Sequence, residues 1–480
     1  MASISTTRRR RSSYNVLPRG LTVKRIALAL IAVVVLVVGT FGVRLALSLA
    51  HAFHTNPISA VFGALGGGNG SSVAQSRQRL QRINIMVYGY GGGGHSGAFL
   101  SDSIMLISIN PRANQQPQIA EISIPRDWYV PIQLNQGKTT YGRINEAYAD
   151  GMNGQGPVAA NQPGAGASVA NPTMEHLLGV HIDYFVGVDF SAFKSAVDSV
   201  GGVDVVVPNT FTDTQYPHGE CDQGDCGYMT VHFNAGLQHM NGATALIFAR
   251  SRHGNGSEGS DFARSRRQQL VVAALKQKVV SIGGIGNLPD LLNALGDNVL
   301  TNLTVSDAES LFGLVKDVNP ANIEHVSIDN TNFLYDCGYP YRCGAYWLYA
   351  HDSSFQSVQH FVQNVFPPDA AIAEKAPVTF FDGSGKGNDA SGRWSQLTTM
   401  VGFRSTDGGR VPKQAVTQVI DESGGKDVQT AKWLASYFGV TVTTQKVVPT
   451  GTGPAAAGGV VVELGSAAEA SFTGNPGVGH

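Results

Sequence analysis

The order of apolar and polar positions along the middle of the chain predicts two alternating kinds of element. Short apolar runs rich in β-branched residues predict strands at 83–89, 103–110, 118–124, 182–189, 203–207 and 323–328. Amphipathic stretches predict helices at 174–179, 190–201, 260–280, 286–296, 306–317 and 353–365. Residues 151–172 are rich in Gly, Ala, Pro and Asn, which predicts a loop. Strands that alternate with helices indicate an α/β fold with a covered sheet.

The chain changes character at the Phe-Pro-Pro sequence that ends at residue 368. Beyond it, a small α+β domain is predicted over 377–466, because further apolar runs flank one amphipathic stretch at 426–439. Residues 467–480 are predicted to form a disordered tail. The strand and helix pattern before the boundary predicts a separate, larger domain over 81–366.

One long uncharged run lies near the N-terminus, from Ile26 to Val43. Eighteen helical residues span roughly 27 Å, which is close to the thickness of the hydrocarbon core of a bilayer. We therefore predict a transmembrane helix over 26–50, with a basic cytoplasmic tail at 1–25 and a flexible tether at 51–80. The excess of Lys and Arg before the run predicts a single-pass protein of the cell membrane whose body lies outside the cytoplasm. A cleaved signal peptide, with a cleavage site near 50–52, is the alternative.

Charge is distributed unevenly along the chain. Eleven of the 34 Lys and Arg residues precede Asp102, the first acidic residue, so the remainder carries 23 basic against 35 acidic residues. A net-acidic body argues against a general nucleic-acid-binding protein, which would present a broad basic face.

The four cysteines form two local pairs in the sequence, Cys221 with Cys226 and Cys337 with Cys343. Two local disulfides are the simplest interpretation for a body outside the cytoplasm, although four cysteines allow three connectivities. A zinc site built from all four thiolates is the competing interpretation.

One short segment, residues 249–269, concentrates positive charge in an otherwise near-neutral chain. It reads ARSRHGNGSEGSDFARSRRQQ and contains Arg250, Arg252, Arg264, Arg266 and Arg267. The guanidinium groups either converge on an anion such as phosphate, which they bind bidentately, or form a solvated patch with a structural ion pair.

Helical phase separates the arginines of this segment. With Ser260 as N-cap, Arg264 and Gln268 share the apolar stripe of the predicted helix, whereas Arg266 points to the opposite side and Arg267 lies at the edge of the stripe. We therefore expect Arg264 to face an anion and Arg266 to face solvent.

Other charged residues flank the predicted strands, where α/β sheets carry ligand sites. Asp102 comes just before one strand, Arg126 and Asp127 come just after another, and Arg143 precedes a helix. A phosphate ligand with a divalent metal would use both signs of charge. The alternatives are a turn or cap role for Asp102 and an ion pair of Asp127 with Arg126 or Arg143.

In this order behind one membrane span, the stretches DSIML, SIPRDWYV, RINEAY and ALIFARSRH…DFARSRRQQ resemble the LytR–CpsA–Psr family of cell-wall ligases. The resemblance is strong over about 80–280 and weak over about 281–366, and 377–466 resembles the small C-terminal domain often attached to these proteins. It implies a three-layer α/β/α core with a mixed sheet and a hydrophobic tunnel for a polyprenyl chain. It also implies a transferase that moves a glycopolymer from a polyprenyl-pyrophosphate carrier onto peptidoglycan through a phosphodiester.

The resemblance also implies roles for particular residues. The implied metal ligand is Asp102, which would hold Mg²⁺ or Mn²⁺. The implied catalytic residues are Arg126, Asp127, Arg252 and Arg264, with Asp127 or Asp102 as candidate general base. The implied pyrophosphate ligands are Arg126, Arg143, Arg250, Arg252, Arg264 and Gln268.

Two positions depart from the family pattern. Relatives often carry an acid shortly after the first strand, where this chain reads GYGGGGHSG and offers His95 instead. Relatives also often carry Arg two residues before the Asp, where this chain has Leu100. One metal ligand and one phosphate ligand of the pattern are therefore absent at these positions.

Two alternative functions use the same sequence features differently. A polyprenyl-pyrophosphate hydrolase would use the same residues with water as the acceptor, and the sequence does not separate it from a transferase. A non-enzymatic envelope regulator or transcriptional attenuator would need a DNA-binding segment inside the cell, and the 25 predicted cytoplasmic residues show no helix-turn-helix pattern.

Overall fold

The computed structural model describes eight stretches of the chain: 72–93, 97–217, 227–281, 299–319, 323–336, 346–385, 390–444 and 458–466. Within these stretches, no helix has both the length and the apolar character needed to cross a membrane. Several predicted features lie outside the described residues, namely the segments 1–25 and 26–50, residues 51–71 of the tether, all four cysteines, His95, the helix at 286–296 and the tail at 467–480.

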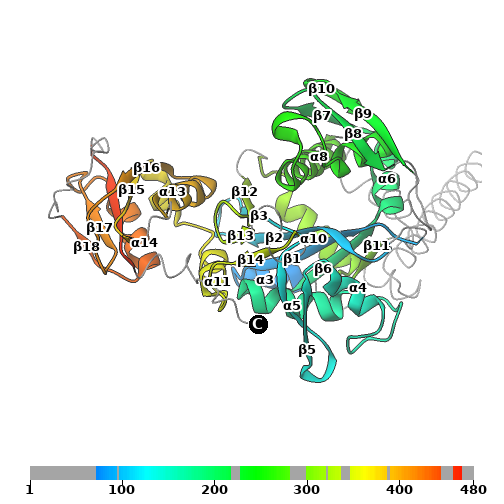
Figure 1. Cartoon of the computed structure of the whole chain (residues 1–480), viewed down its shortest axis with the longest axis horizontal. Coiled ribbons are helices and arrows are strands. Elements are labelled where there is room, and N and C mark those ends of the chain that lie inside the picture. Colours follow the sequence, from blue (N-terminus) through cyan, green and yellow to red (C-terminus); the bar gives the residue numbers. More distant parts are fainter. Residues whose placement is uncertain are drawn as a thin grey trace, which may run out of the picture.

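A six-stranded sheet with the order β11-β6-β1-β2-β3-β12 forms the centre of the larger part (Figure 1). Its strands are β1 (Ile83–Tyr90), β2 (Ser101–Asn110), β3 (Gln118–Ile124), β6 (Tyr184–Asp189), β11 (Val299–Thr301) and β12 (Ile323–Ser327). β2 is antiparallel to both of its neighbours, β6 is parallel to β1, and β12 is parallel to β3. The predicted α/β fold with a mixed sheet is therefore confirmed.

Helices cover both faces of this sheet, because the side chains of each strand alternate between two hydrophobic clusters. Met86 and Tyr88 point into one cluster, whereas Ile83 and Ile85 point into the other. The first face packs against α4 (Glu146–Met152), α5 (Ala167–Leu178) and α11 (Gln356–Gln363). The second face packs against α3 (Ser72–Gln78) and α10 (Val305–Val315), and α8 (Asp261–Ser281) lies over the same face.

Helix α5 begins earlier than the sequence pattern indicates. Its first half falls within 151–172, which is predicted as a loop, and it contains Pro172. Four residues of the helix, Val169, Ala170, Met174 and Leu177, are almost completely buried. Burial of this face against the sheet outweighs the poor helix propensity of the local composition.

A lobe beside the sheet carries the arginine-rich segment (Figure 1). It has its own hydrophobic cluster, which includes Phe211, Phe233, Phe248 and Val271. Its elements are α6 (Phe190–Ser199), β7 (Val203–Val207), β8 (Phe211–Pro217), β9 (Tyr228–Phe233), β10 (Gly236–Met240), α7 (Gly242–Arg250) and η2 (Gly256–Glu258).

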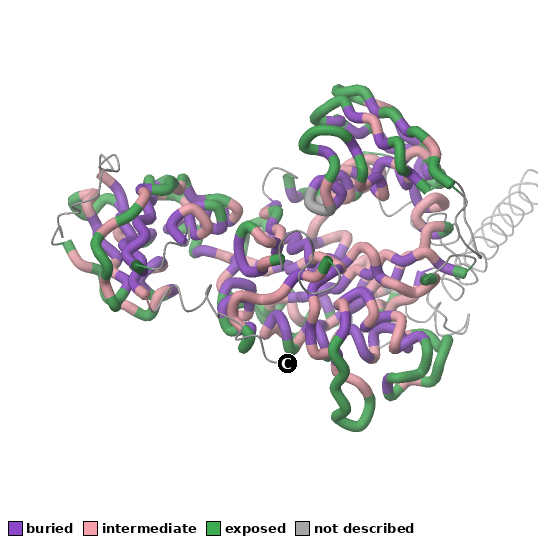
Figure 2. Tube along the Cα trace, in the orientation of Figure 1, coloured by how far each residue is buried: buried purple, intermediate pink, exposed green. Residues whose placement is uncertain are grey.

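Two small strand pairs lie close together near the end of β3. β4 (Tyr129–Gln133) pairs with β5 (Thr139–Arg143) around η1 (Asn135–Gly137), and β13 (Leu334–Asp336) pairs with β14 (Leu348–Ala350). A bridge between Trp128 and Leu348 joins the two pairs. The tip of the first hairpin is exposed along its length (Figure 2).

A second, five-stranded sheet follows with the order β16-β15-β19-β17-β18. Its elements are α12 (Asp369–Glu374), β15 (Pro377–Asp382), α13 (Ala390–Met400), β16 (Arg404–Arg410), β17 (Gln418–Asp421), α14 (Val428–Phe438), β18 (Val442–Thr443) and β19 (Val460–Leu464). Arg393 of α13 lies 2.9 Å from His351 of the larger part, and Tyr437 of α14 packs on His360 of α11.

Candidate functional site

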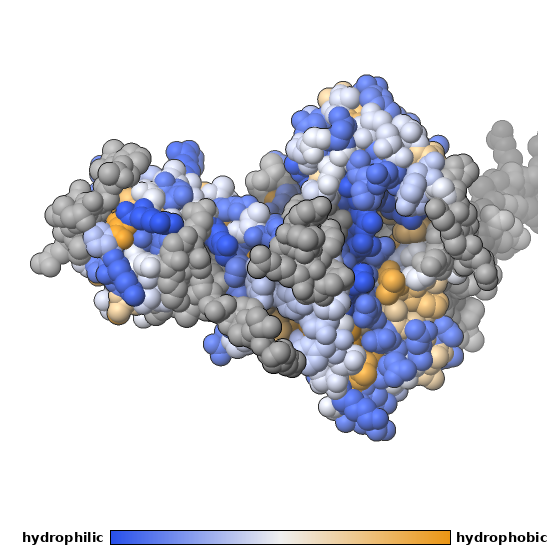
Figure 3. Space-filling view, viewed as in Figure 1, coloured by the Kyte–Doolittle hydropathy of each residue, from blue (hydrophilic) through white to orange (hydrophobic). Residues whose placement is uncertain are grey.

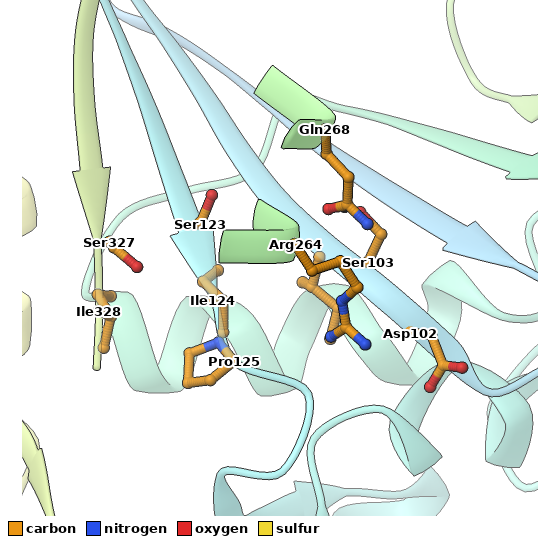
Figure 4. A pocket seen from close by; sticks show the side chains of 10 residues that line it. Asp102, Ser103, Ser123, Ile124, Pro125, Arg264, Gln268, Ser327 and Ile328 are labelled. Carbon is orange, nitrogen blue, oxygen red and sulfur yellow. Dashed lines mark hydrogen bonds between the residues drawn. The ribbon is translucent and has the colours of Figure 1, made fainter. Parts of the chain in front are cut away.

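A small pocket lies where β2 begins and where β3 and β12 end, beneath the first turns of α8 (Figure 4). It is lined by Asp102, Ser103, Ile104, Ser123, Ile124, Pro125, Arg264, Gln268, Ser327 and Ile328. β3 and β12 are parallel, so their carboxyl ends meet at this edge, where α/β proteins place ligands. The cavity volume of about 10 Å³ accommodates roughly one water molecule, so a larger ligand must lie across the mouth of the pocket.

A chain of ion pairs surrounds the mouth of this pocket. Nη1 of Arg126 donates to Oδ1 of Asp102 at 2.7 Å, and Nε of Arg126 lies 3.3 Å from Oδ2 of Asp127. Nη1 of Arg143 lies 3.6 Å from Oδ1 of Asp127. The structure thus brings together the charged residues that flank different strands. Asp127 is buried between two arginines, which is the ion-pair arrangement considered as an alternative.

The charge balance around Asp102 is positive. Burial raises the pKa of the Asp102 carboxyl, but the positive charges of Arg126, Arg264 and Arg252 outweigh burial and hold its pKa below the ordinary 3.8. Asp102 is therefore ionised at neutral pH. Three guanidinium groups around one carboxylate leave an excess of positive charge at the mouth of the pocket, which suits an anionic ligand.

Helix α8 positions Arg264 and Gln268 above the pocket. The helix starts after Ser260, whose Oγ accepts a hydrogen bond from the Ala263 N–H at 3.1 Å, so Ser260 is the N-cap that the sequence predicts. Arg264 is only 6% exposed, and Oε1 of Gln268 accepts from Ser103 Oγ at 2.8 Å. Both side chains point from the helix toward β2 (Figure 4), as the helical phase predicts.

Two of the five arginines are engaged within the protein by one buried acid. Nη1 of Arg267 lies 2.6 Å from Oε2 of Glu258, and Nη2 of Arg266 lies 2.5 Å from Oε1 of the same residue. Arg267 is fully buried and also donates to the carbonyl oxygens of Phe248 and Ser251, whereas the Arg266 side chain is half exposed. Helical phase places Arg267 at the edge of the apolar stripe, but the buried Glu258 draws it fully inside.

Arg250 lies against aromatic rings. Its guanidinium carbon is 4.0 Å from the ring centre of Phe190 and 5.7 Å from that of Tyr216. A cation over an aromatic face is stabilised by the ring quadrupole. This arrangement gives Arg250 a structural explanation, and its role as a pyrophosphate ligand stays a prediction.

The backbone that carries Arg252 is held by a buried acid that sequence reasoning missed. Oδ2 of Asp213 accepts from Ser251 Oγ at 2.6 Å, from the Arg252 N–H at 3.2 Å and from the His253 N–H at 3.1 Å. Asp213 is completely buried on β8. The alternation of side chains along a strand could have indicated this burial, because Asp213 is two residues after the buried Phe211 and so points to the same side of β8.

The residues around the pocket could hold a metal ion only together with a ligand that supplies further oxygen atoms. Among the described residues, no three His, Cys, Asp or Glu side chains converge on a point where they could hold a metal. Mg²⁺ commonly keeps several waters and binds one or two carboxylates together with substrate phosphates. Asp102 alone therefore suits a metal that arrives with a phosphate ligand.

Comparison with known proteins gives a consistent result. Residues 61–357 match the model of the LytR_cpsA_psr family. The chain is 31% identical over 292 residues to the polyisoprenyl-teichoic acid–peptidoglycan teichoic acid transferase TagU of Bacillus anthracis, covering 60% of this chain and 81% of TagU. It is 27% identical over 316 residues to the transferase TagV of Bacillus subtilis, covering 64% and 71%. The crystal structure of B. subtilis TagV is similar with a TM-score of 0.44 and 25% identity, covering 59% and 96%. Because the family model spans more than half of the sequence, the protein belongs to the LytR–CpsA–Psr family.

Proposed function

We propose that the protein transfers a glycopolymer from a polyprenyl-pyrophosphate carrier to peptidoglycan and joins the two through a phosphodiester. The observation that carries this proposal is the positive charge around Asp102 at the pocket mouth: Arg126 pairs with Asp102, Arg264 lines the same pocket, and the charge of Arg252 also lowers the pKa of Asp102. TagU and TagV, to which the chain is similar, are transferases that by name move teichoic acid from a polyisoprenyl carrier to peptidoglycan.

The proposed reaction is one displacement at phosphorus. A hydroxyl oxygen of peptidoglycan attacks the phosphorus atom that carries the glycopolymer, and the bond from that phosphorus to the bridging oxygen breaks. Polyprenyl phosphate leaves with the bridging oxygen and its electron pair, and the hydroxyl proton passes to water. Charge that builds on the leaving phosphate lies among the guanidinium groups, which stabilise it.

Neither acid at the mouth of the pocket is arranged as a strong general base. The pKa of Asp102 is held below its ordinary value, and Asp127 is buried between Arg126 and Arg143. A loose phosphoryl-transfer transition state depends on positioning and charge stabilisation more than on early proton removal. We therefore assign Asp127 a positioning role, in which it orients the two arginines.

Asp102 would hold Mg²⁺, or Mn²⁺ in its place, together with oxygen atoms of the pyrophosphate. The bound ion supplies Lewis-acid stabilisation of the phosphate oxygens. Asp102 suits this role because its side chain is 47% exposed and its carboxylate stays ionised well below neutral pH.

The polyprenyl chain would lie in a tunnel along the sheet face beneath α8 and α10. Apolar side chains there, including Val87, Ile107 and Val186, are only partly buried. Hydrophobic side chains are also exposed beside the hydrophilic ones below the lobe (Figure 3).

A carrier of this kind resides in a membrane, which agrees with the proposed helix over 26–50 and a body outside the cytoplasm. The unit over 377–466 is proposed as an attached domain of the family's C-terminal type.

Hydrolysis of the same carrier is the alternative reaction, since water could replace the peptidoglycan hydroxyl. The test uses the full-length chain with Mg²⁺ and a short lipid-pyrophosphate-linked glycan, with and without a glycan acceptor. Transfer predicts an acceptor carrying a new phosphodiester and faster release of polyprenyl phosphate when acceptor is present. Release that is independent of acceptor, with free sugar phosphate as the product, would identify a hydrolase. Absence of any release would refute both.

A further inference from the structure

A row of aromatic rings lies on the surface beside the arginine site. The rings of Tyr129 and Trp347 are stacked with centres 4.8 Å apart, and those of Tyr129 and Tyr141 are stacked 6.1 Å apart. Tyr349 continues the row 5.6 Å from Tyr129, and Tyr335 is stacked 5.7 Å beyond Tyr349. We call these five residues, which come from β4, β5, β13, β14 and the residue before β14, the aromatic row.

The aromatic row is a surface feature and not part of the core. Tyr141 is 65% exposed, and the other four rings are partly exposed. Trp128, directly before Tyr129, is in contrast completely buried and packs edge-on against Phe355. The chain therefore directs one aromatic side chain into the core and the next one outward, into the row.

Hairpin stability alone does not account for the row. Aromatic neighbours across a strand pair contribute about 0.2–1 kcal/mol, which would explain Tyr129 next to Tyr141. The row however crosses from this hairpin to a second strand pair, β13–β14, which the sequence supplies some 190 residues later. A contiguous exposed apolar patch of this kind usually marks a binding surface.

The middle of the aromatic row adjoins the charged residues of the proposed site. Tyr129 is the register partner of Arg143, whose guanidinium lies 3.6 Å from Asp127. The N–H of Leu348, between Trp347 and Tyr349, donates to the carbonyl oxygen of Asp127 at 3.0 Å. A ligand lying along the row would thus pass beside the ion pairs at the pocket mouth.

Polar groups border the same surface. Arg143 and Glu146 are each about two-fifths exposed, and His351 packs against the ring of Tyr335 at the far end of the row. Flat aromatic faces flanked by hydrogen-bonding side chains suit a pyranose chain, because sugar rings present C–H groups on their faces and hydroxyls at their edges. Phosphates alone would gain little from the electron-rich faces of these rings.

We propose that the aromatic row binds the glycan strand that accepts the polymer. The proposal rests on the proposed function, since a transferase needs an acceptor site next to its phosphate site. β4, which carries Tyr129, packs through Val130 and Ile132 into the cluster on the α5 and α11 side of the sheet, whereas the proposed polyprenyl tunnel lies on the α8 side. Separate sides for donor lipid and acceptor glycan allow both to reach the pocket mouth together.

The test measures glycan binding apart from catalysis. The full-length chain is titrated with a soluble β-1,4-linked N-acetylglucosamine oligomer and sedimented with purified peptidoglycan. Removing one stacked ring, in Tyr141→Ala or Trp347→Ala, is expected to weaken binding of both probes by about threefold to tenfold. Tyr228→Ala is the matched control, because Tyr228 is 63% exposed but lies on β9 in the lobe.

A second measurement separates this proposal from the proposed function. Arg264→Ala is expected to bind both glycan probes as the wild type does, while it loses release of polyprenyl phosphate. Tyr141→Ala is expected to raise the KM for the acceptor with little change in kcat. Glycan binding that changes no more in Tyr141→Ala and Trp347→Ala than in Tyr228→Ala would overturn the acceptor site. Weakened binding of the lipid-linked donor alone would also overturn it, since the row would then hold the donor glycan.

Discussion

Each arginine of the 249–269 segment has different surroundings, and these decide what its loss costs. Arg264 is almost completely buried at the pocket, where its charge would meet the pyrophosphate. Loss of such a desolvated charge contact typically costs about 2–5 kcal/mol. Arg264→Ala should therefore slow release of polyprenyl phosphate by about 30- to 4,000-fold. Arg264→Lys should also be impaired, because an ammonium group cannot bind two oxygens in the planar geometry of a guanidinium.

Arg266 offers the matched control on the same helix. Its side chain is half exposed, and its partner Glu258 keeps a second ion pair with Arg267 when Arg266 is removed. Because Arg266 reaches solvent and Glu258 is not left unpaired, we expect the Arg266–Glu258 pair to contribute at most about 1 kcal/mol. Arg266→Ala should therefore change the release rate less than about threefold, in variants checked for folding by circular dichroism. If Arg264→Ala and Arg266→Ala slowed the release of polyprenyl phosphate equally, the assignment of helix faces would be wrong.

The Arg267–Glu258 pair makes a prediction about stability. Both side chains are buried, and removing one partner of a buried pair typically costs about 3–5 kcal/mol because the other charge is left behind. Arg267→Met should lower the free energy of unfolding of the larger domain by that order. Denaturant titration measures it, with Arg266→Ala as the control. A loss no greater than that of Arg266→Ala would contradict the structural role of the pair.

At the residue scale, the sequence predicts which side of helix α8 each of its residues faces. The period of 3.6 residues puts Arg264 and Gln268 on one side of α8, and the structure has them there. The helical period does not reveal that Glu258 is buried in the core, where it forms an ion pair with Arg267. Nor does it reveal Asp213 beneath Ser251, because that contact depends on how a distant strand packs.

At the scale of elements, Asp213 of β8 fixes the turn that carries Arg252. Asp213→Ala leaves the Ser251 hydroxyl and the N–H groups of Arg252 and His253 without their acceptor. A buried unsatisfied group costs about 1–3 kcal/mol. We therefore expect Asp213→Ala to lower the stability of the fold and to leave Arg252 less well positioned. We expect a lower thermal midpoint together with slower release of polyprenyl phosphate. Wild-type values for both would contradict this anchoring.

The Asp213 carboxyl also makes the stability of the folded protein depend on pH. Burial raises the pKa of Asp213, but hydrogen bonds from Ser251 and from the N–H groups of Gln215, His253 and Arg252 outweigh it and leave the pKa below 3.8. A pKa lowered by folding stabilises the folded state above the unfolded pKa, and this contribution is lost as pH falls through the folded pKa. The difference in stability between wild type and Asp213→Asn should therefore shrink as pH falls below about 4. A difference that stays constant down to pH 2.5, in denaturant titrations, would contradict it.

The sequence predicts most elements of the central sheet, because β1, β2 and β3 contain short, near-continuous apolar runs rich in β-branched residues, which are typical of covered strands. Helix α8 is predicted to within about one residue of its observed bounds, Asp261–Ser281, since its cap and stripe agree. The first half of α5 was not predicted, because small residues and Pro172 hide the buried face. The partners of β12 and β13, which complete the pocket and the aromatic row, are set by long-range packing that local patterns do not encode.

At the scale of the whole molecule, His351 and Arg393 lie between the two sheet-containing parts. Burial, and then the charge of Arg393, lowers the pKa of His351 from 6.5 to about 4. Any state in which the parts separate therefore binds a proton at His351 more strongly than the docked state does. Docking should be unaffected above about pH 6.5 and should weaken as pH falls from there toward about 4.

Small-angle scattering of the full-length chain measures this effect as a growing radius of gyration at low pH. His351→Gln should reduce the pH dependence, because glutamine does not titrate and retains an acceptor for Arg393. Identical pH profiles for the wild type and His351→Gln would show that this contact does not control docking.

The central claim is that the arginine cluster holds the pyrophosphate of a polyprenyl-linked glycan. Native mass spectrometry of the full-length chain, incubated in mild detergent with Mg²⁺ and a polyprenyl-pyrophosphate-linked disaccharide, tests it most directly. The account predicts a one-to-one complex of the wild type, retained by Arg266→Ala and lost or strongly weakened in Arg252→Ala and Arg264→Ala. Equal retention of the lipid by all four proteins, or no complex with the wild type, would contradict it.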